Sequence, residues 1–176
     1  DANVVLFHVP LPVRFKVDGQ VVDRNLQITK TAEDFYIRLA KAPKIVRVDP
    51  NVTLLAKVSF APPTAQIHAQ LADKSDALGR LQAVELLAKR KDKTTREKLK
   101  HALQNDTFYA VRIAASRALR GIGSDDAFSA LIASTNQPNA KVRRQVISDI
   151  ASQYKPEALA ALKQSLAKEK NPAIRS

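Results

Sequence analysis

The chain has 176 residues, 45% of them hydrophobic, which is ordinary for a globular protein of one domain or two small ones. Its net charge of +12 could serve to bind an acidic partner or nucleic acid, but the cations are scattered along the sequence, which favours solvated outer faces of helices. The absence of cysteine excludes disulfide bonds and thiolate metal sites, and no apolar run approaches the roughly 20 residues of a membrane-spanning helix.

Both ends of the chain bear on its location and completeness. No signal-peptide pattern opens it, so with no cysteine present we expect a cytoplasmic protein without a membrane partner. The chain starts at Asp1 rather than at a methionine, and it stops soon after Asn171-Pro172 begins another repeat. We therefore expect further sequence beyond both ends.

The first sixty residues alternate between apolar and polar side chains, which is the period of β-strands. Asp18-Gly19 separates two such runs and favours a two-residue hairpin turn, because both central residues of that turn take positive φ. About six or seven short strands joined by tight turns predict a small antiparallel β-sandwich. Besides the hairpin, strands are predicted at residues 4–9, 26–28, 35–39, 45–48 and 54–60.

The pattern changes at Ala61-Pro62-Pro63, where paired prolines end the strands and prepare a helix start. We therefore divide the chain into a β-sandwich domain, residues 1–61, and a helical repeat domain, residues 62–176. The predicted fold class is α+β in two segregated domains. Helices are predicted at residues 64–73, 76–90, 94–104, 107–121, 125–134, 139–153 and 156–168, with short loops that make neighbouring helices antiparallel.

The helical part repeats itself. Four arginines recur at spacings of 32, 31 and 32 residues, and apolar residues recur in phase with them, seven and nineteen residues further on. Such a fixed period is typical of a solenoid, in which each unit buries its apolar face against the next. The recurring positions are Arg80, Arg112, Arg143 and Arg175, then Leu87, Leu119 and Ile150, and Leu99, Leu131 and Leu162.

The unit that begins at Asp106 shows the repeat pattern most clearly, with Val111-Arg112, Ala115 and Leu119 following in helical register. This pattern resembles short HEAT-like repeats, which implies a right-handed α-solenoid of helix pairs. The signature residues of tetratricopeptide and ankyrin repeats are absent.

The recurring arginines favour a structural role, because a guanidinium can bind carbonyls or a carboxylate of the adjoining repeat. We expect a packing ladder of Arg80, Arg112, Arg143 and Arg175, with Asp106 as a partner for Arg112. A ligand-facing role is the alternative. Arg117 and Arg120 do not recur, so they are the candidates for contacting a substrate or partner.

No catalytic apparatus can be recognised in the chain. Its histidines, His8, His68 and His101, are far apart in sequence, and none begins the His-Glu-x-x-His pattern of a zinc hydrolase. No nucleophile elbow, phosphate-binding loop or dinucleotide fingerprint is present. We therefore expect no catalytic, cofactor-binding or metal-binding residue in this chain.

Nucleic acid is not the expected partner, despite the positive charge. Single-stranded nucleic acid binds where aromatic side chains lie among cations, and the helical part has few aromatics, most of them at core positions of the repeats. Charge alone supplies only weak, salt-sensitive binding.

The order of the parts resembles the C-terminal region of the aminopeptidase N family of zinc metallopeptidases. The resemblance rests on VRFKVDGQVV in residues 13–22, on IVRVDPN with Leu54-Leu55 in residues 45–55, and on the Pro-Pro that precedes the helices. It implies a β-sandwich linking a catalytic domain to a helical domain. The family's zinc motif and its Gly-x-Met-Glu-Asn substrate motif have no matching positions here, so no catalytic role is carried over.

The resemblance implies that this chain is a non-catalytic C-terminal fragment of a zinc-dependent aminopeptidase. The fragment would pack on the catalytic domain of the same parent chain, where the zinc ion belongs, and shape access for the peptide substrate. The alternative is a protein-interaction scaffold, including the peptidase-inactive relative among the TATA-binding-protein-associated factors. A HEAT-like DNA-binding module is a further alternative.

Overall fold

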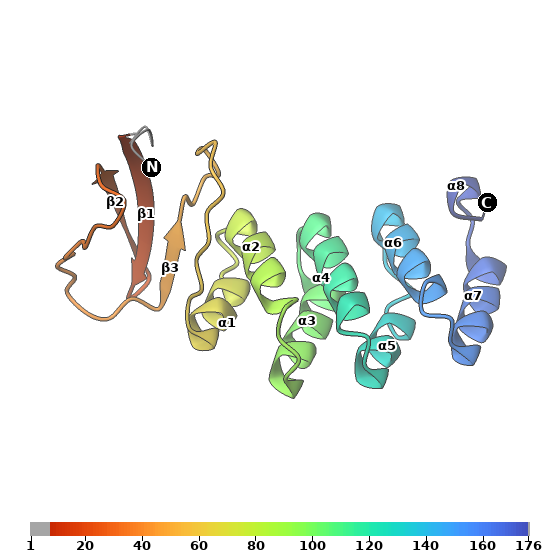
Figure 1. Ribbon diagram of the computed structural model, residues 1–176. Helices are drawn as coiled ribbons and strands as arrows, with labels where there is room; N and C mark the ends of the chain where they lie inside the picture. Colours follow the sequence, from red (N-terminus) through yellow and green to blue (C-terminus); the bar gives the residue numbers. More distant parts are fainter. Residues whose placement is uncertain (1–7, 176) are drawn as a thin grey trace. The chain divides into compact units, whose positions relative to one another are not determined.

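A computed structural model describes residues 8–175 of the chain (Figure 1). The chain divides into two compact units, residues 1–70 and residues 71–176. The first unit holds a three-stranded antiparallel sheet, and the second is built from helices. The fold class is therefore α+β with a helical repeat region, as the sequence predicts.

A β-hairpin opens the described part of the first unit. β1 (Val9–Val17) pairs with β2 (Gln20–Ile28), with Val17 opposite Gln20. The two residues between them have the positive φ of a type I′ turn, 48° at Asp18 and 82° at Gly19. The hairpin predicted from Asp18-Gly19 is confirmed.

The sheet is completed by β3 (Ile45–Val48), which pairs with the other side of β1 and gives the strand order β2-β1-β3. Val13, Phe15 and Val17 of β1 are buried on one face. Ile37 and Leu39, from the segment between β2 and β3, pack against them.

The sequence predicts more strands than the structure contains. Among residues 8–175 there are three strands in one sheet, so the described residues do not form the predicted two-sheet β-sandwich, and residues 35–39 and 54–60 form no strand. A period-2 pattern places apolar side chains on one face, but a strand also needs a neighbour for its backbone hydrogen bonds. Both segments keep the alternation without that neighbour. The strand predicted at residues 4–9 lies almost entirely outside the described residues.

Eight helices follow within residues 8–175, and seven of them were predicted to within a few residues. The sharp boundaries have local causes: Asp92 and Asn139 cap helix starts with their side chains, and Gly123 ends a helix with a φ of 68°. The helices are α1 (Thr64–Ala72), α2 (Ala77–Leu87), α3 (Lys93–Asn105), α4 (Tyr109–Ile122), α5 (Asp125–Ile132), α6 (Ala140–Ala151), α7 (Pro156–Lys168) and α8 (Pro172–Arg175).

Within the second unit the helices form two rows, with α2, α4 and α6 in one and α3, α5 and α7 in the other (Figure 1). α4 lies at the centre and packs against α2, α3, α5 and α6. The recurring apolar positions supply the core, because five of the six that belong to complete repeats have no exposed surface: Leu87, Leu99, Leu119, Leu131 and Ile150. Leu162, the sixth, is half-buried.

Candidate functional site

The first interface between repeats is joined by a buried ion pair. Arg80, on α2, donates from Nε and Nη2 to the two carboxylate oxygens of Asp106, at 2.7 and 3.0 Å. Its Nη1 donates to the backbone carbonyls of Asp73 and Lys74, at 2.9 and 3.0 Å. The side chains of Arg80 and Asp106 are only 4% and 7% exposed. This rung therefore ties α2 to the turn between α3 and α4.

The same arrangement returns 63 residues later. Arg143, on α6, donates to both carboxylate oxygens of Glu169, at 2.8 and 3.0 Å, and to the carbonyls of Gln137 and Pro138. In both rungs the acid stands 26 residues after the arginine, follows the last residue of a helix, and accepts a backbone N–H two residues further on. Each acidic residue thus follows the end of one helix, accepts a backbone N–H from the turn before the next helix, and binds the arginine of the preceding repeat.

The middle rung has no carboxylate. Arg112, on α4, donates from Nη1 to the side-chain oxygen of Gln137, at 3.2 Å, and the amide nitrogen of Gln137 donates to the carbonyl of Leu103. Nε of Arg112 is buried and has no hydrogen-bond partner among the described residues. In this rung the acceptor is the uncharged amide of Gln137, and Arg112 forms fewer hydrogen bonds than Arg80 and Arg143 do.

The partner expected for Arg112 is wrong. Asp106 binds Arg80 of the preceding repeat, not Arg112, because the carboxylate follows α3 and faces back toward α2. Arg175, the last arginine of the predicted ladder, is exposed at the end of α8. Glu169 and Gln137 were missed by sequence reasoning, although the 26-residue spacing between Arg80 and Asp106 would have located Glu169.

Arg117 and Arg120, the two arginines without counterparts, lie between α4 and α6. Arg117 is exposed and donates from Nε and Nη2 to the side-chain oxygen of Gln145, at 3.1 and 2.9 Å. Nε of Arg120 lies 3.5 Å from a carboxylate oxygen of Asp149. The structure thus brings both arginines to one helix interface.

Asp149 is the centre of this polar cluster and has no exposed surface. Besides Arg120, its carboxylate accepts hydrogen bonds from the hydroxyl of Ser116, at 2.7 Å, and from the amide of Gln145, at 3.0 Å. A buried aspartate is costly unless such donors surround it. Sequence reasoning missed Asp149, although an acid at a position where the other repeats carry Ala118 and Leu86 is a usable signal.

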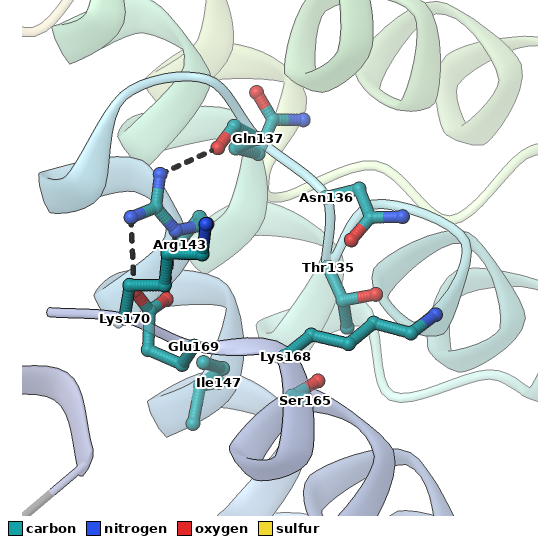
Figure 2. Close-up of a pocket in the computed structure, with 9 residues that line it drawn as sticks. All are labelled: Thr135, Asn136, Gln137, Arg143, Ile147, Ser165, Lys168, Glu169 and Lys170. Carbon is teal, nitrogen blue, oxygen red and sulfur yellow. Dashed lines mark hydrogen bonds and ion pairs between the residues drawn. The ribbon is translucent and has the colours of Figure 1, made fainter.

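A pocket of about 280 Å³ lies beside the third rung (Figure 2). One wall is the ion pair of Arg143 and Glu169, and Ile147 supplies apolar surface. Because Arg143 and Glu169 already bind each other, the pocket is part of the interface between repeats rather than a cluster of reactive groups. Its remaining lining residues are Thr135, Asn136, Gln137, Ser165, Lys168 and Lys170.

The histidines lie apart, with His8 just before β1, His68 in α1 and His101 in α3. Among residues 8–175, no group of three or more His, Cys, Asp or Glu side chains is close enough together to hold a metal ion. Within the same residues, none of the helices is both long enough and apolar enough to span a membrane.

Comparison with known proteins bears on the helical region. A family model described as HEAT repeats matches residues 64–140. No curated protein and no solved structure matches the chain significantly. The matched segment runs from α1 to the start of α6 and contains the first two rungs with their partners. The HEAT-like pattern read from the sequence is therefore supported.

The first rung yields a prediction for stability. Asp106→Ala leaves the buried guanidinium of Arg80 without its carboxylate, so the free energy of unfolding should fall by about 3 kcal/mol. Asp126→Ala, which removes a carboxylate that is 75% exposed, should change it by less than about 0.5 kcal/mol. Urea denaturation of both variants measures the difference. Equal losses would show that the rung adds nothing beyond a surface charge.

The third rung yields a prediction for pH dependence. The pKa of Glu169 falls from 4.5 to about 2, because Arg143 and the backbone N–H of Asn171 donate hydrogen bonds to its carboxylate. A carboxylate with a lowered folded-state pKa stabilises the fold above pH 4.5 and loses that contribution as the pH falls toward 2.

The stability difference between wild type and Glu169→Gln should therefore be constant near neutral pH and should shrink below pH 4.5. Urea midpoints measured across this range test the expectation, with Glu157→Gln, an exposed residue of α7, as the control. A difference that stays constant down to pH 2 contradicts it.

Proposed function

We propose that this chain is a non-catalytic protein-interaction module, in which the helical repeats present a surface to a partner protein. The HEAT-repeat match supports this proposal, since repeat stacks form extended surfaces that bind other proteins. The chemistry of the chain agrees with it, because the carboxylates of Asp106, Asp149 and Glu169 are bound by donors of neighbouring elements rather than left poised for catalysis.

The observation that carries the proposal is the contrast between packing positions that repeat within the array and surface positions that vary from repeat to repeat. Arg80, Arg112 and Arg143 hold equivalent places at the repeat interfaces. Five residues after each arginine the helix is exposed, and there the residues differ: Glu85, Arg117 and Ser148. A surface on which a constant scaffold displays different side chains suits recognition of one particular partner.

We place the binding surface on the row formed by α2, α4 and α6. This row carries the two arginines that have no counterpart in other repeats, and its α6 also carries two exposed cations, Lys141 and Arg144. Arginine is enriched at protein interfaces, because its planar head group binds carboxylates through two parallel hydrogen bonds.

A second candidate function is the one that the resemblance implies, in which the partner is the catalytic domain of an aminopeptidase on the same parent chain. The specific observation in its favour is the apolar surface of the first unit. Leu55, Val58 and Phe60 are exposed in a segment without regular structure, as are Phe35 and Tyr36 before β3. Contiguous exposed apolar residues mark surfaces that another protein covers.

In that case the resemblance implies that the zinc ion belongs to the catalytic domain of the parent chain. A cytoplasmic location goes with both candidates as a proposal, and its support is the lack of cysteine.

A matched pair of variants tests the interaction surface. Ser148 on α6 and Ser129 on α5 are both exposed helical serines, but they lie in opposite rows. We expect Ser148→Trp to weaken retention of the proteins that the wild-type chain binds in an extract of its own cells by more than about tenfold, since the indole blocks close contact. Ser129→Trp should leave retention unchanged, and equal effects of the two variants contradict the placement.

The peptidase candidate is tested by the coding sequence upstream of Asp1. This candidate requires that sequence to encode a His-Glu-x-x-His motif followed by a distant glutamate, the ligand set of a catalytic zinc site. The catalytic domain expressed from that sequence should then bind this chain, and replacing Leu55 and Phe60 by Ser should weaken the complex. An upstream sequence that encodes no zinc motif removes this candidate and leaves the interaction module.

A further inference from the structure

The two exposed arginines of α4 differ in what neutralises them. Arg120 approaches a buried carboxylate, whereas the acceptor for Arg117 is an uncharged amide. Both residues are exposed, and the sequence made both of them candidates for contacting a partner. Their surroundings separate them into one residue that serves the fold and one that remains available for a ligand.

Arg120 is committed to Asp149. The carboxylate of Asp149 is fully buried, and its hydrogen bonds from Ser116 and Gln145 come from neutral groups that supply no counter-charge. Arg120 supplies the positive charge, because it forms an ion pair with Asp149 even though its own side chain is 46% exposed. A ligand that drew Arg120 away would leave a buried charge without a counter-ion, which is strongly unfavourable.

Arg117 is held in place without being neutralised. Its Nε and Nη2 share one oxygen of Gln145, so further N–H groups of the guanidinium remain for another acceptor. The amide nitrogen of Gln145 donates to Asp149, and this bond turns the amide oxygen toward Arg117. Asp149 therefore acts on Arg117 through Gln145, and it fixes a surface guanidinium that keeps its full charge.

We propose that Arg117 is the anion-binding residue of the row, and that it takes a side-chain carboxylate from an acidic segment of the partner protein. The inference rests on the proposed function, because it assumes that this row is the interaction surface. Arg144 adds positive charge to the same row, since it is exposed on α6. Asp149 and Gln145 are positioning residues, and Arg120 keeps the buried charge compensated.

Nuclear magnetic resonance of the arginine Nε–H groups tests this inference in the whole chain. The probe is a hexaglutamate peptide with blocked ends, and the control is hexaglutamine. We expect the Arg117 signal to shift and saturate with hexaglutamate, while the Arg120 signal stays in place. Arg117→Lys should weaken binding about fivefold, because the second parallel hydrogen bond is lost, and Arg120→Lys should change it by less than about twofold.

The outcomes separate the inference from the proposed function. If backbone signals along α4 and α6 shift while the Arg117 signal does not, the row binds acidic segments but the choice of residue is overturned. If no signal of the row shifts, the acidic partner is overturned, and only the Ser148→Trp comparison still bears on the row itself. A larger shift of Arg120 than of Arg117 reverses the assignment. Equal binding of a short DNA oligonucleotide points to a non-specific cation and overturns the carboxylate preference.

Stability measurements supply a readout that binding alone does not. Arg120→Ala should lower the urea midpoint, and adding Asp149→Asn should restore part of the loss, because it removes the uncompensated buried charge. Arg117→Ala should leave the midpoint unchanged. If Arg117→Ala destabilises the fold as much as Arg120→Ala does, Arg117 is a structural residue and the inference fails.

Discussion

The helical unit depends on one repeated interaction, in which a buried guanidinium joins two adjacent repeats. Arg80 and Arg143 each meet a carboxylate and two backbone carbonyls, so nearly every donor of the head group is satisfied within the array. Because the carboxylates also follow α3 and α7 and accept an N–H of the next segment, the same contact fixes both the stacking of helices and the path of the chain between them.

The polar cluster between α4 and α6 depends on this scaffold. The Arg112 rung sets the separation of α4 from the segment that leads into α6, and the apolar positions that recur with it place Leu119 and Ile150 in the core. Only with the helices held at that separation does Ser116 of α4 reach Asp149, whereas Gln145 contacts Asp149 within α6 itself. A buried carboxylate at this interface thereby positions side chains on the surface above it.

Much of this could be predicted from the sequence, because the helical period, the capping residues and the recurring arginines are local signals. The partner of Asp106 could not, since it depends on which arginine the turn after α3 faces. The number of strands was overestimated, because alternation near Phe35 and Phe60 marks an apolar face but does not supply a pairing strand. Asp149 was not predicted, because the other repeats have no aspartate at the equivalent position and its role depends on the contact between α4 and α6.

The amide at the centre of the ladder has a consequence for how the array responds to its surroundings. The third rung joins full charges and its Arg143 is 24% exposed, so acid and dissolved ions act on that rung directly. Gln137 carries no charge, and its bonds to Arg112 and to the carbonyl of Leu103 keep their strength when the carboxylate of Glu169 is protonated. The stack therefore has one interface that solvent conditions can loosen beside one that they leave intact.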